Sequence, residues 1–275
     1  MTAPTADIGV FGGSGLYTLL EDVDEVRVDT PWGAPSGPVH VGHLDGRTVA
    51  FLPRHGADHS IPPHRINYRA NVWAMRELGV RAVLGPCAAG SLDPSVKPGD
   101  LVICDQLVDR TYGRHQTFFD GPVTNHVSFA DPYCPTLRAV AQQAARDEGI
   151  DCHDTGTVVV VQGPRFSTRA ESRWFRAQGW EVVNMTQYPE AFLARELGIC
   201  YATLALITDY DTGVEDVPGV EPVNQTDVFA FFKANLPRLR STLYRALRAI
   251  DLDAVGCCST ATNGLDPVPP ATDGP

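Results

Sequence analysis

Short apolar runs alternate with amphipathic helical segments along most of the chain, and this alternation constrains the fold more than any other feature. Apolar runs with the length and β-branched content of buried strands cover residues 8–11, 82–84, 101–104, 157–161, 181–184 and 200–208. Helical spacing covers residues 67–78, 135–148, 168–178, 189–197 and 224–250, with a bend expected at Pro237. Strands that alternate with helices form layered structures, so we expect an α/β fold in which helices cover a sheet.

The chain also contains a predicted β-hairpin and a change of composition near its end. The segments Val39–Leu44 and Thr48–Pro53 flank Asp45-Gly46, a residue pair that favours a tight hairpin turn. Nothing resembling a linker divides the preceding sequence, so we expect one domain over residues 1–252. From Asp253 onward the chain is rich in Gly, Pro, Ser and Thr, which predicts a flexible tail over residues 253–275.

Charge and composition exclude several classes of function. The 22 Lys and Arg residues against 33 Asp and Glu residues give a net charge of −11, which argues against nucleic-acid binding through overall charge. There is neither a long apolar span nor a signal-peptide pattern, so we expect no membrane partner and a cytoplasmic location. The seven cysteines contain no C-x-x-C pair and are interpreted as reduced thiols. Pro62 and Pro63 break the spacing of His55, His59 and His64, so we expect no metal site.

Six polar or glycine-rich clusters follow apolar runs. They are Gly12-Gly13-Ser14-Gly15, Arg54-His55-Gly56, Cys87-Ala88-Ala89-Gly90-Ser91, Gln162–Glu171, Asn184-Met185-Thr186 and Thr208-Asp209-Tyr210-Asp211. Taken singly, most of these clusters also have a purely structural interpretation as a tight turn, a surface charge pair or a helix cap. For the Cys87 cluster, a tightly packed turn and a close approach of the backbone to a ligand are equally good interpretations. Ligands bind at the carboxyl ends of strands in open α/β sheets, so together the six clusters predict one pocket.

The residue types in these clusters suggest what such a pocket would bind. A glycine turn offers backbone N–H groups to an oxyanion, and the neighbouring Arg54 and His55 could contact a phosphate. Phe166 could stack on a flat ring, and Met185 between two polar residues suits a sugar. Asp209 and Asp211 leave a buried strand as a pair, a setting in which a carboxyl group can have a raised pKa and act as an acid.

In this order, the clusters resemble the trimeric purine nucleoside phosphorylase family over residues 8 to 247, and within it the branch that acts on S-methyl-5′-thioadenosine. The resemblance implies a single-domain, layered α/β/α phosphorylase fold with a central mixed β-sheet, and a homotrimer. It also implies a pentosyltransferase of purine and methionine salvage, which uses phosphate to convert methylthioadenosine to adenine and 5-methylthioribose 1-phosphate. Inorganic phosphate is then a co-substrate, and neither a metal nor an organic cofactor is required.

The same resemblance implies roles for individual residues at matching positions. The phosphate-binding positions are Ser14, Arg54, His55, Cys87, Ala88 and Thr186. The nucleoside-binding positions are Phe166, Ser167, Asn184, Met185, Asp209, Asp211, Gln225 and Val228, with His126 supplied by a neighbouring subunit. Asp209 and Asp211 are the expected catalytic residues, with a protonated Asp209 as the acid at the purine N7. Cys87 and Gln225 depart from the family pattern, in which Thr and an apolar residue are usual.

The purine base that we expect the protein to prefer depends on the residue at position 209. Relatives that act on 6-oxopurines have Asn where this chain has Asp209, and a carboxylate accepts a hydrogen bond from the 6-amino group of adenine. The alternatives are a phosphorylase for adenosine or 6-oxopurine nucleosides, a nucleoside hydrolase, and a non-catalytic nucleoside-binding protein. Arg54 and His55 favour a phosphorylase over a hydrolase, because water needs no phosphate-binding residues.

Overall fold

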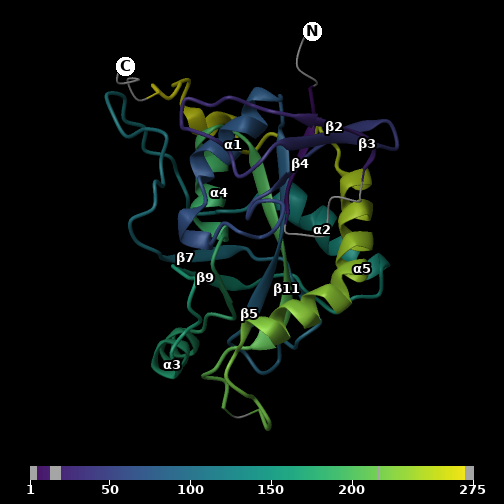
Figure 1. Cartoon of the computed structure of the whole chain (residues 1–275), viewed down its shortest axis with the longest axis vertical. Coiled ribbons are helices and arrows are strands. Elements are labelled where there is room, and N and C mark those ends of the chain that lie inside the picture. The colour runs from purple at the N-terminus through teal and green to yellow at the C-terminus, as the bar shows by residue number, and fades with distance from the viewer. Residues whose placement is uncertain (1–4, 13–19, 216, 270–275) are drawn as a thin grey trace.

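The computed structural model describes residues 5–12, 20–215 and 217–269, in which eleven strands form one sheet. Its two longest strands are β5 (Ala82–Ser91) and β11 (Cys200–Tyr210), which run side by side through the middle of the molecule (Figure 1). These strands pair in parallel from Cys200 opposite Ala82 to Tyr210 opposite Ser91, with a bulge between Ile207 and Asp209. They therefore form the centre from which the rest of the sheet extends.

Two groups of parallel strands meet in this sheet. The first group extends from β5 through β1 (Ile8–Gly12) and β4 (Arg47–Pro53) to the antiparallel β3 (Val39–Leu44) and β2 (Glu21–Val26). The second group is β10 (Val182–Asn184), β9 (Thr157–Val161) and β7 (Gln106–Arg110). The short β6 (Leu101–Val102) pairs with β11 and with β8 (Cys152–His153). Because β10 runs antiparallel to β5, the sheet is mixed and the carboxyl ends of the two groups converge.

Helices cover both faces of the sheet, which confirms the layered α/β/α architecture (Figure 1). On one face α1 (Tyr68–Glu77) and α4 (Gln187–Glu196) bury Trp73, Met75 and Leu193. On the other face α2 (Pro135–Asp147) and α5 (Gln225–Ala249) bury residues such as Leu137 and Leu243. The helix α3 (Arg169–Ala177) packs Phe175 against β9 and β10, and short 3-10 turns cover Pro63–Arg65 and Ser259–Thr262. None of the described helices has the length and apolar character needed to cross a membrane.

Local sequence signals explain where most elements begin. The side chains of Asn67, Thr168 and Asn224 accept hydrogen bonds from backbone N–H groups in the first turns of α1, α3 and α5. The turn between β3 and β4 has Asp45 at φ 48° and Gly46 at φ 78°, the left-handed conformation that the sequence predicts there. Figure 1 also shows α5, which contains Pro237, changing direction along its length.

The strand expected at residues 82–84 is longer than predicted, because β5 continues to Ser91, so the Cys87 cluster is part of a strand and the alternative of a tight turn is wrong. Gly85-Pro86 resembles a strand terminator in sequence, yet the parallel pairing with β11 continues across it, with Leu204 opposite Pro86. The small residues that follow allow close packing on both sides of the strand. The polar or very short strands β2, β7 and β8 were not predicted, since their residues lack a continuous apolar pattern.

The segment after Asp253 differs from the expected flexible tail as far as it is described, to residue 269. Val255 and Cys258 are buried in the same core as α2 and α5. Asn125 Nδ2 donates to the carbonyl of Ala261 at 3.3 Å, and Arg76 forms an ion pair of 2.6 Å with Asp266. A few apolar residues among the Gly and Pro are therefore enough to anchor this segment, while residues 270–275 lie outside the described part.

Gly85 gives a test of the close packing between β5 and β11. A Cβ atom at this position would lie 2.1 Å from the hydroxyl oxygen of the buried Tyr201. We expect Gly85→Ala to lower the free energy of unfolding by about 1–3 kcal/mol, as overpacking of a core does. Urea denaturation measures this change. Gly37→Ala is the control, because its Cβ would meet nothing closer than 3.9 Å; equal effects of the two substitutions would contradict the proposed clash.

Candidate active site

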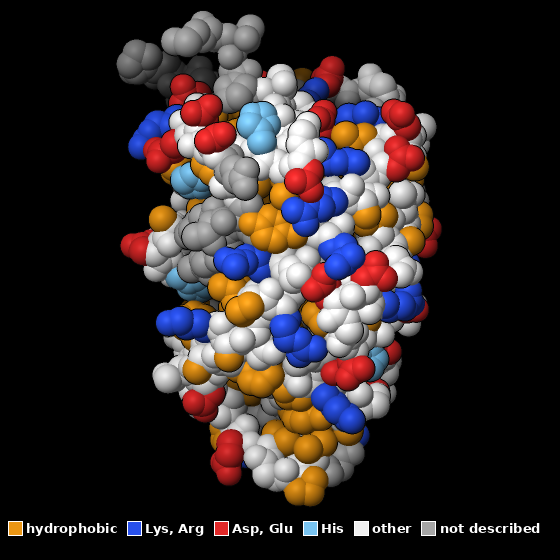
Figure 2. Space-filling view, turned by 90° about the vertical axis from the view of Figure 1, so that its right-hand side faces the viewer, with side chains coloured by type: hydrophobic (Ala, Val, Ile, Leu, Met, Phe, Trp, Pro, Cys, Tyr) orange, Lys and Arg blue, Asp and Glu red, His pale blue; other side chains and the backbone are white. Residues whose placement is uncertain are grey.

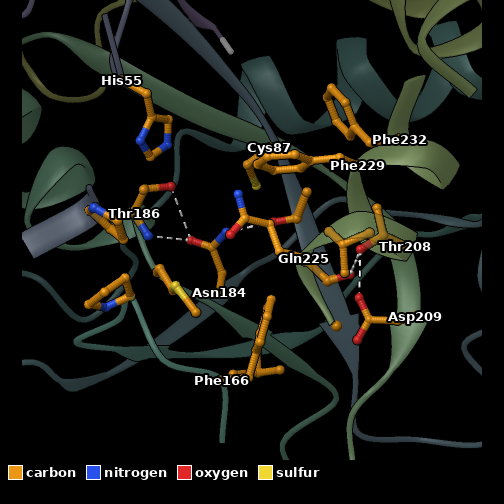
Figure 3. Close-up of a pocket in the computed structure, with 18 of the residues that line it drawn as sticks. His55, Cys87, Phe166, Asn184, Thr186, Thr208, Asp209, Gln225, Phe229 and Phe232 are labelled. Atoms are coloured by element: carbon orange, nitrogen blue, oxygen red, sulfur yellow. Dashed lines mark hydrogen bonds between the residues drawn. The ribbon is translucent and has the colours of Figure 1, made fainter. Parts of the chain in front are cut away.

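A cavity of about 840 Å³ opens where the carboxyl ends of the two strand groups converge, beside α5. Figure 3 shows His55 and Thr186 at one end of it, Asp209 at the other, and Phe166 between them. Thirteen of the predicted site residues line this cavity. They are Arg54, His55, Cys87, Ala88, Phe166, Ser167, Asn184, Met185, Thr186, Asp209, Asp211, Gln225 and Val228.

Two predicted residues are not part of this cavity as the structure describes it. Ser14, predicted to contact phosphate, lies outside the described residues. His126 is exposed and does not line the cavity of its own chain. That placement is compatible with the predicted role of His126 in a neighbouring subunit, which a single chain does not test.

Arg54 supplies a buried positive charge just after the end of β4. Its Nε and Nη2 atoms donate to the two carboxylate oxygens of Glu190 at 2.9 and 2.7 Å, and its Nη1 donates to the carbonyl of Pro86 at 2.9 Å. Burial alone would lower the pKa of the Arg54 guanidinium, but the adjacent Glu190 carboxylate raises it well above its usual range. Three of its five N–H donors are thus engaged, and the guanidinium is fixed at the cavity wall.

His55 lies beside Arg54 in a defined protonation state. Its Nδ1 is 2.9 Å from the carbonyl oxygen of Ile61, which can only accept, so Nδ1 carries the proton. Burial, together with the charge of Arg54, lowers the pKa of His55 from 6.5 to about 3. The His59 ring stacks on that of His55 with 4.2 Å between centroids. A neutral His55 therefore has Nε2 free of a proton and able to accept a hydrogen bond.

Asn184 shapes the turn that joins β10 to α4. Its Oδ1 accepts from the backbone N–H groups of Thr186 at 2.7 Å and Gln187 at 2.9 Å, while its Nδ2 donates to the carbonyl of Ala88 at 2.9 Å. These bonds join the turn to β5 and hold the start of α4 at the cavity. Asn184 therefore acts mainly by positioning Met185 and Thr186.

Gly163 allows Met185 to lie close to the adjoining loop. Gly163 has φ +61°, and a Cβ atom there would lie 2.6 Å from the Met185 sulfur. The positive φ and the short distance both require glycine at this position. Met185 thus forms part of the cavity wall.

Asp209 lies at the bulge in β11, where pairing with β5 shifts by one residue. Its Oδ1 accepts from the Thr208 hydroxyl at 2.7 Å. Burial, with a smaller contribution from the nearby Asp211 charge, raises the pKa of Asp209 from 3.8 to about 6. A Cβ atom on Gly90 would lie 3.1 Å from Asp209 Oδ2, so the glycine in β5 leaves room for the carboxyl group. Asp209 is thus an acid poised to gain or lose a proton near neutral pH.

Asp211 and Ser167 line the cavity together with Asp209. Burial raises the pKa of Asp211, and hydrogen bonds from the side chains of Ser172 and Ser167 partly offset this rise. The Asp211 carboxyl group is thus held by two serine hydroxyls at the cavity wall.

The helix α5 adds an apolar wall that the sequence prediction covered only in part. Besides Gln225 and Val228, the residues Phe229, Phe232, Lys233 and Leu236 line the cavity. The spacing of the apolar members marks one helix face, a signal that could have identified them. Figure 2 shows the face that carries α5, where basic and acidic side chains are interspersed and hydrophobic side chains gather near the lower end.

Glu190 and Tyr201 were also missed, although both support the cationic end of the cavity. The Tyr201 hydroxyl donates to Glu190 Oε1 at 2.7 Å, and Glu190 in turn holds Arg54. Both side chains are buried, with exposures of 1% for Glu190 and 2% for Tyr201. No local pattern marks them, because the importance of Glu190 depends on Arg54, which is 136 residues away in the chain, and Tyr201 acts through Glu190.

The fold and this cavity define a nucleoside phosphorylase type of architecture, and the comparisons with known proteins agree. The family model described as "Phosphorylase superfamily" matches residues 7–250, and the chain belongs to this family. At the level of individual proteins, the chain is 55% identical to a purine nucleoside phosphorylase of Streptomyces coelicolor, over 95% of this chain and 96% of that one. It is also 55% identical to an S-methyl-5′-thioadenosine phosphorylase of Mycolicibacterium smegmatis, over 90% of this chain and 92% of the relative.

Solved structures give the same result. The fold matches a methylthioadenosine phosphorylase from an Antarctic soil metagenomic library with a TM-score of 0.88 and 40% identity, covering 94% of this chain and 91% of that one. It matches the methylthioadenosine phosphorylase of Schistosoma mansoni in complex with tubercidin with a TM-score of 0.85 and 34% identity, covering 94% and 98%. The expected phosphorylase fold is therefore confirmed.

The raised pKa of Asp209 predicts a pH dependence of stability. Below pH 4 the Asp209 carboxyl group is protonated in both the folded and the unfolded protein. Between about pH 4 and 6 the unfolded chain releases this proton first, since the folded pKa is about 6, so the free energy of unfolding falls as the pH rises. We expect Asp209→Asn to remove this fall and to stabilise the ligand-free protein at pH 7 by on the order of 2–3 kcal/mol.

Urea denaturation at a series of pH values measures this effect. The exposed Asp253→Asn serves as the control and should follow the wild-type curve. A wild-type and an Asp209→Asn protein with parallel pH profiles would show that Asp209 ionises normally in the folded state.

Proposed function

We propose that this protein cleaves S-methyl-5′-thioadenosine with inorganic phosphate, giving adenine and 5-methylthioribose 1-phosphate for purine and methionine salvage. The observation that carries the proposal is Asp209, a partly buried carboxyl group whose pKa is raised to about 6, in a cavity whose opposite end holds Arg54 and His55. The names of several relatives support it, including those from Mycolicibacterium smegmatis and Mycobacterium tuberculosis, each 55% identical to this chain.

Phosphate binds at the end of the cavity that contains Arg54, His55 and Thr186. The fixed guanidinium of Arg54 supplies the positive charge. His55 is neutral with Nε2 unprotonated, so it accepts a hydrogen bond from a protonated phosphate oxygen. This arrangement orients an unprotonated oxygen of the same phosphate toward the sugar.

Cleavage then proceeds at C1′ of the ribose. A phosphate oxygen forms a bond to C1′ while the bond from C1′ to N9 of the purine breaks and its electron pair moves into the base. Protonated Asp209 donates its proton to N7, which neutralises the leaving adenine, and Asp211 supports the same edge of the ring. General acid catalysis of this kind contributes about 10²- to 10⁴-fold. Phe166 lies where it can stack on the purine, and Met185 contacts the ribose.

The 5′ substituent lies against α5. An apolar wall suited to a methylthio group is formed by Val228, Phe229, Phe232 and Leu236, and the Phe229 ring lies edge-on to that of His59 with 5.2 Å between centroids.

We propose a homotrimer in which His126 of one subunit covers the 5′ group bound in another, because His126 is exposed and outside its own cavity. Sedimentation at assay concentrations checks the assembly, and a fully active monomer would contradict it.

A purine nucleoside phosphorylase acting on adenosine or 6-oxopurine nucleosides is the second candidate. The name of the Streptomyces coelicolor relative favours it, and so does the presence of Gln225 and Lys233 on the otherwise apolar wall, where they could bind a 5′-hydroxyl group.

For both candidate functions, we propose that phosphate is the co-substrate and that no metal or organic cofactor takes part in the reaction. The seven free thiols support a cytoplasmic location.

Product analysis with and without phosphate tests the proposal directly. With methylthioadenosine, we expect adenine release to fall by about 100-fold or more when phosphate is omitted, because the bound nucleophile is lost. Adenosine and inosine serve as comparison substrates and rank the two candidates. Adenine release that is independent of phosphate would indicate a hydrolase, and binding without cleavage would indicate a nucleoside-binding protein.

Asp209→Asn tests base recognition separately from stability. The neutral amide is a weaker acceptor for a 6-amino group and has no proton to transfer, yet it can donate to a 6-oxo group. Loss of one charge-assisted contact costs about 1.5–3 kcal/mol, so we expect the preference for methylthioadenosine over methylthioinosine to fall by about 10- to 100-fold. The ratio of the two kcat/KM values measures this preference and cancels any loss of folded protein. An unchanged ratio would contradict the role of Asp209 in base recognition.

A further inference from the structure

Four cysteines from three distant parts of the chain converge at the end of β11 opposite the active site. Cys134 precedes α2, Cys200 begins β11, and Cys257 and Cys258 lie in the segment after α5. Since strands rise about 3.3 Å per residue, Cys200 is about 30 Å along β11 from Asp209. This thiol cluster therefore belongs to neither the phosphate nor the nucleoside site.

The sulfur positions in the thiol cluster match those of a metal site. The Sγ atoms of Cys134, Cys200 and Cys257 all lie within 4.8 Å of one another. Cys257 Sγ is 3.5 Å from Cys200 Sγ and 3.6 Å from Cys258 Sγ. Two thiolates that bind one Zn²⁺ at about 2.3 Å in a tetrahedron are about 3.8 Å apart, so an ion would fit between these sulfurs with small adjustments.

We propose that Cys134, Cys200 and Cys257 bind a soft d¹⁰ cation, with Zn²⁺ as the primary candidate, and that Cys258 is close enough to complete the ligand set. Thiolate sulfur is the ligand type that selects such ions over Mg²⁺ or Ca²⁺. Each thiol that binds releases its proton to solvent.

The surroundings suit such a site. Cys134 and Cys200 are buried and Cys257 is exposed, so the site is preformed on the core side and open to an ion from solvent. Arg81 adjoins it: its carbonyl accepts from the Cys200 N–H at 3.0 Å, and its side chain donates to the carbonyl of Leu252 at 2.9 Å. Arg81 thus ties the start of β11 to the segment that carries Cys257. Cys134 also stands at the N-terminal end of α2, where the helix dipole favours an anion.

The structural consequence is a fixed attachment of the segment after α5. This segment is otherwise held by the burial of Val255 and by hydrogen bonds such as that from Asn125 to the Ala261 carbonyl. The ion would join it to β11 and to the start of α2. Asn125 is next to His126, so the attachment also supports the loop that carries this histidine.

Metal binding to the full-length, reduced and chelator-treated protein tests the site. We expect the protein to retain about one Zn²⁺ or Co²⁺ per chain after dialysis, with a sulfur-to-cobalt charge-transfer absorption for Co²⁺. Cys257→Ala removes the exposed ligand and should reduce retained metal to below about one tenth of an ion per chain. Cys152→Ala is the matched control, because Cys152 is a partly exposed free thiol in β8 outside the cluster, and it should bind as the wild type does.

Several outcomes would overturn the proposal. Reduced wild-type protein that retains no ion would refute the site. If the protein is isolated with a disulfide between Cys200 and Cys257, the same test applies after this disulfide has been reduced. Equal retention by wild-type and Cys257→Ala protein would show binding elsewhere on the surface. Zn²⁺ should also raise the melting temperature of the wild type and of Cys152→Ala but not that of Cys257→Ala. This readout does not depend on catalysis, so failure of the proposed enzyme activity would leave it unaffected.

Discussion

The buried ion pair of Arg54 and Glu190 is the interaction on which the active site depends. A guanidinium with 2% exposure is unfavourable unless its charge is compensated, and the two parallel hydrogen bonds to Glu190 provide this compensation. Tyr201 and the carbonyl of Pro86 complete the network. It joins the end of β4 to α4, β5 and β11, so the end of the cavity that contains Arg54 has little freedom to move. Removing one partner of such a pair typically costs about 3–5 kcal/mol.

The mixed sheet explains how groups of opposite chemical character share one cavity. β5 and β11 bring Asp209 to the cavity from one direction, whereas β9 and β10 bring Phe166 and Met185 from the other. A purely parallel sheet would place all these strand ends along one edge. Their convergence surrounds the cavity on several sides, and the resulting burial raises the pKa of Asp209 and lowers that of His55. The same burial thus produces a proton donor at one end and a neutral acceptor at the other.

Two ends of β11 carry different chemistry. The carboxyl end carries the Asp209 and Asp211 pair, while the amino end carries Cys200 in the thiol cluster. Between them, close contacts such as that of Gly85 with Tyr201 leave little room for movement of β11 against β5. The segment after α5 is anchored beside the amino end, where it also contacts Asn125 in the loop that contains His126. The segment after α5 therefore links the amino end of β11 to the loop that contains His126.

Local patterns in the sequence determined most elements of this fold, because strand and helix periodicity and capping residues act over a few positions. Asn67, Thr168 and Asn224 mark helix starts, and Asp45-Gly46 marks the hairpin turn. Eleven of the predicted residues that line the cavity lie in clusters that follow apolar strands, whereas Gln225 and Val228 were expected only from the family resemblance. The sequence did not reveal that β5 passes through Gly85-Pro86, because that depends on pairing with β11.

Only the tertiary structure decided which distant groups meet. Glu190 and Tyr201 hold Arg54, and four cysteines without a recognisable spacing form one cluster, through contacts between residues far apart in the chain. The pKa values of Asp209 and His55 were likewise decided by burial, which depends on every element packed around them. Local sequence specifies the preferred conformation of each segment, whereas desolvation and charge pairing arise only when the segments pack together.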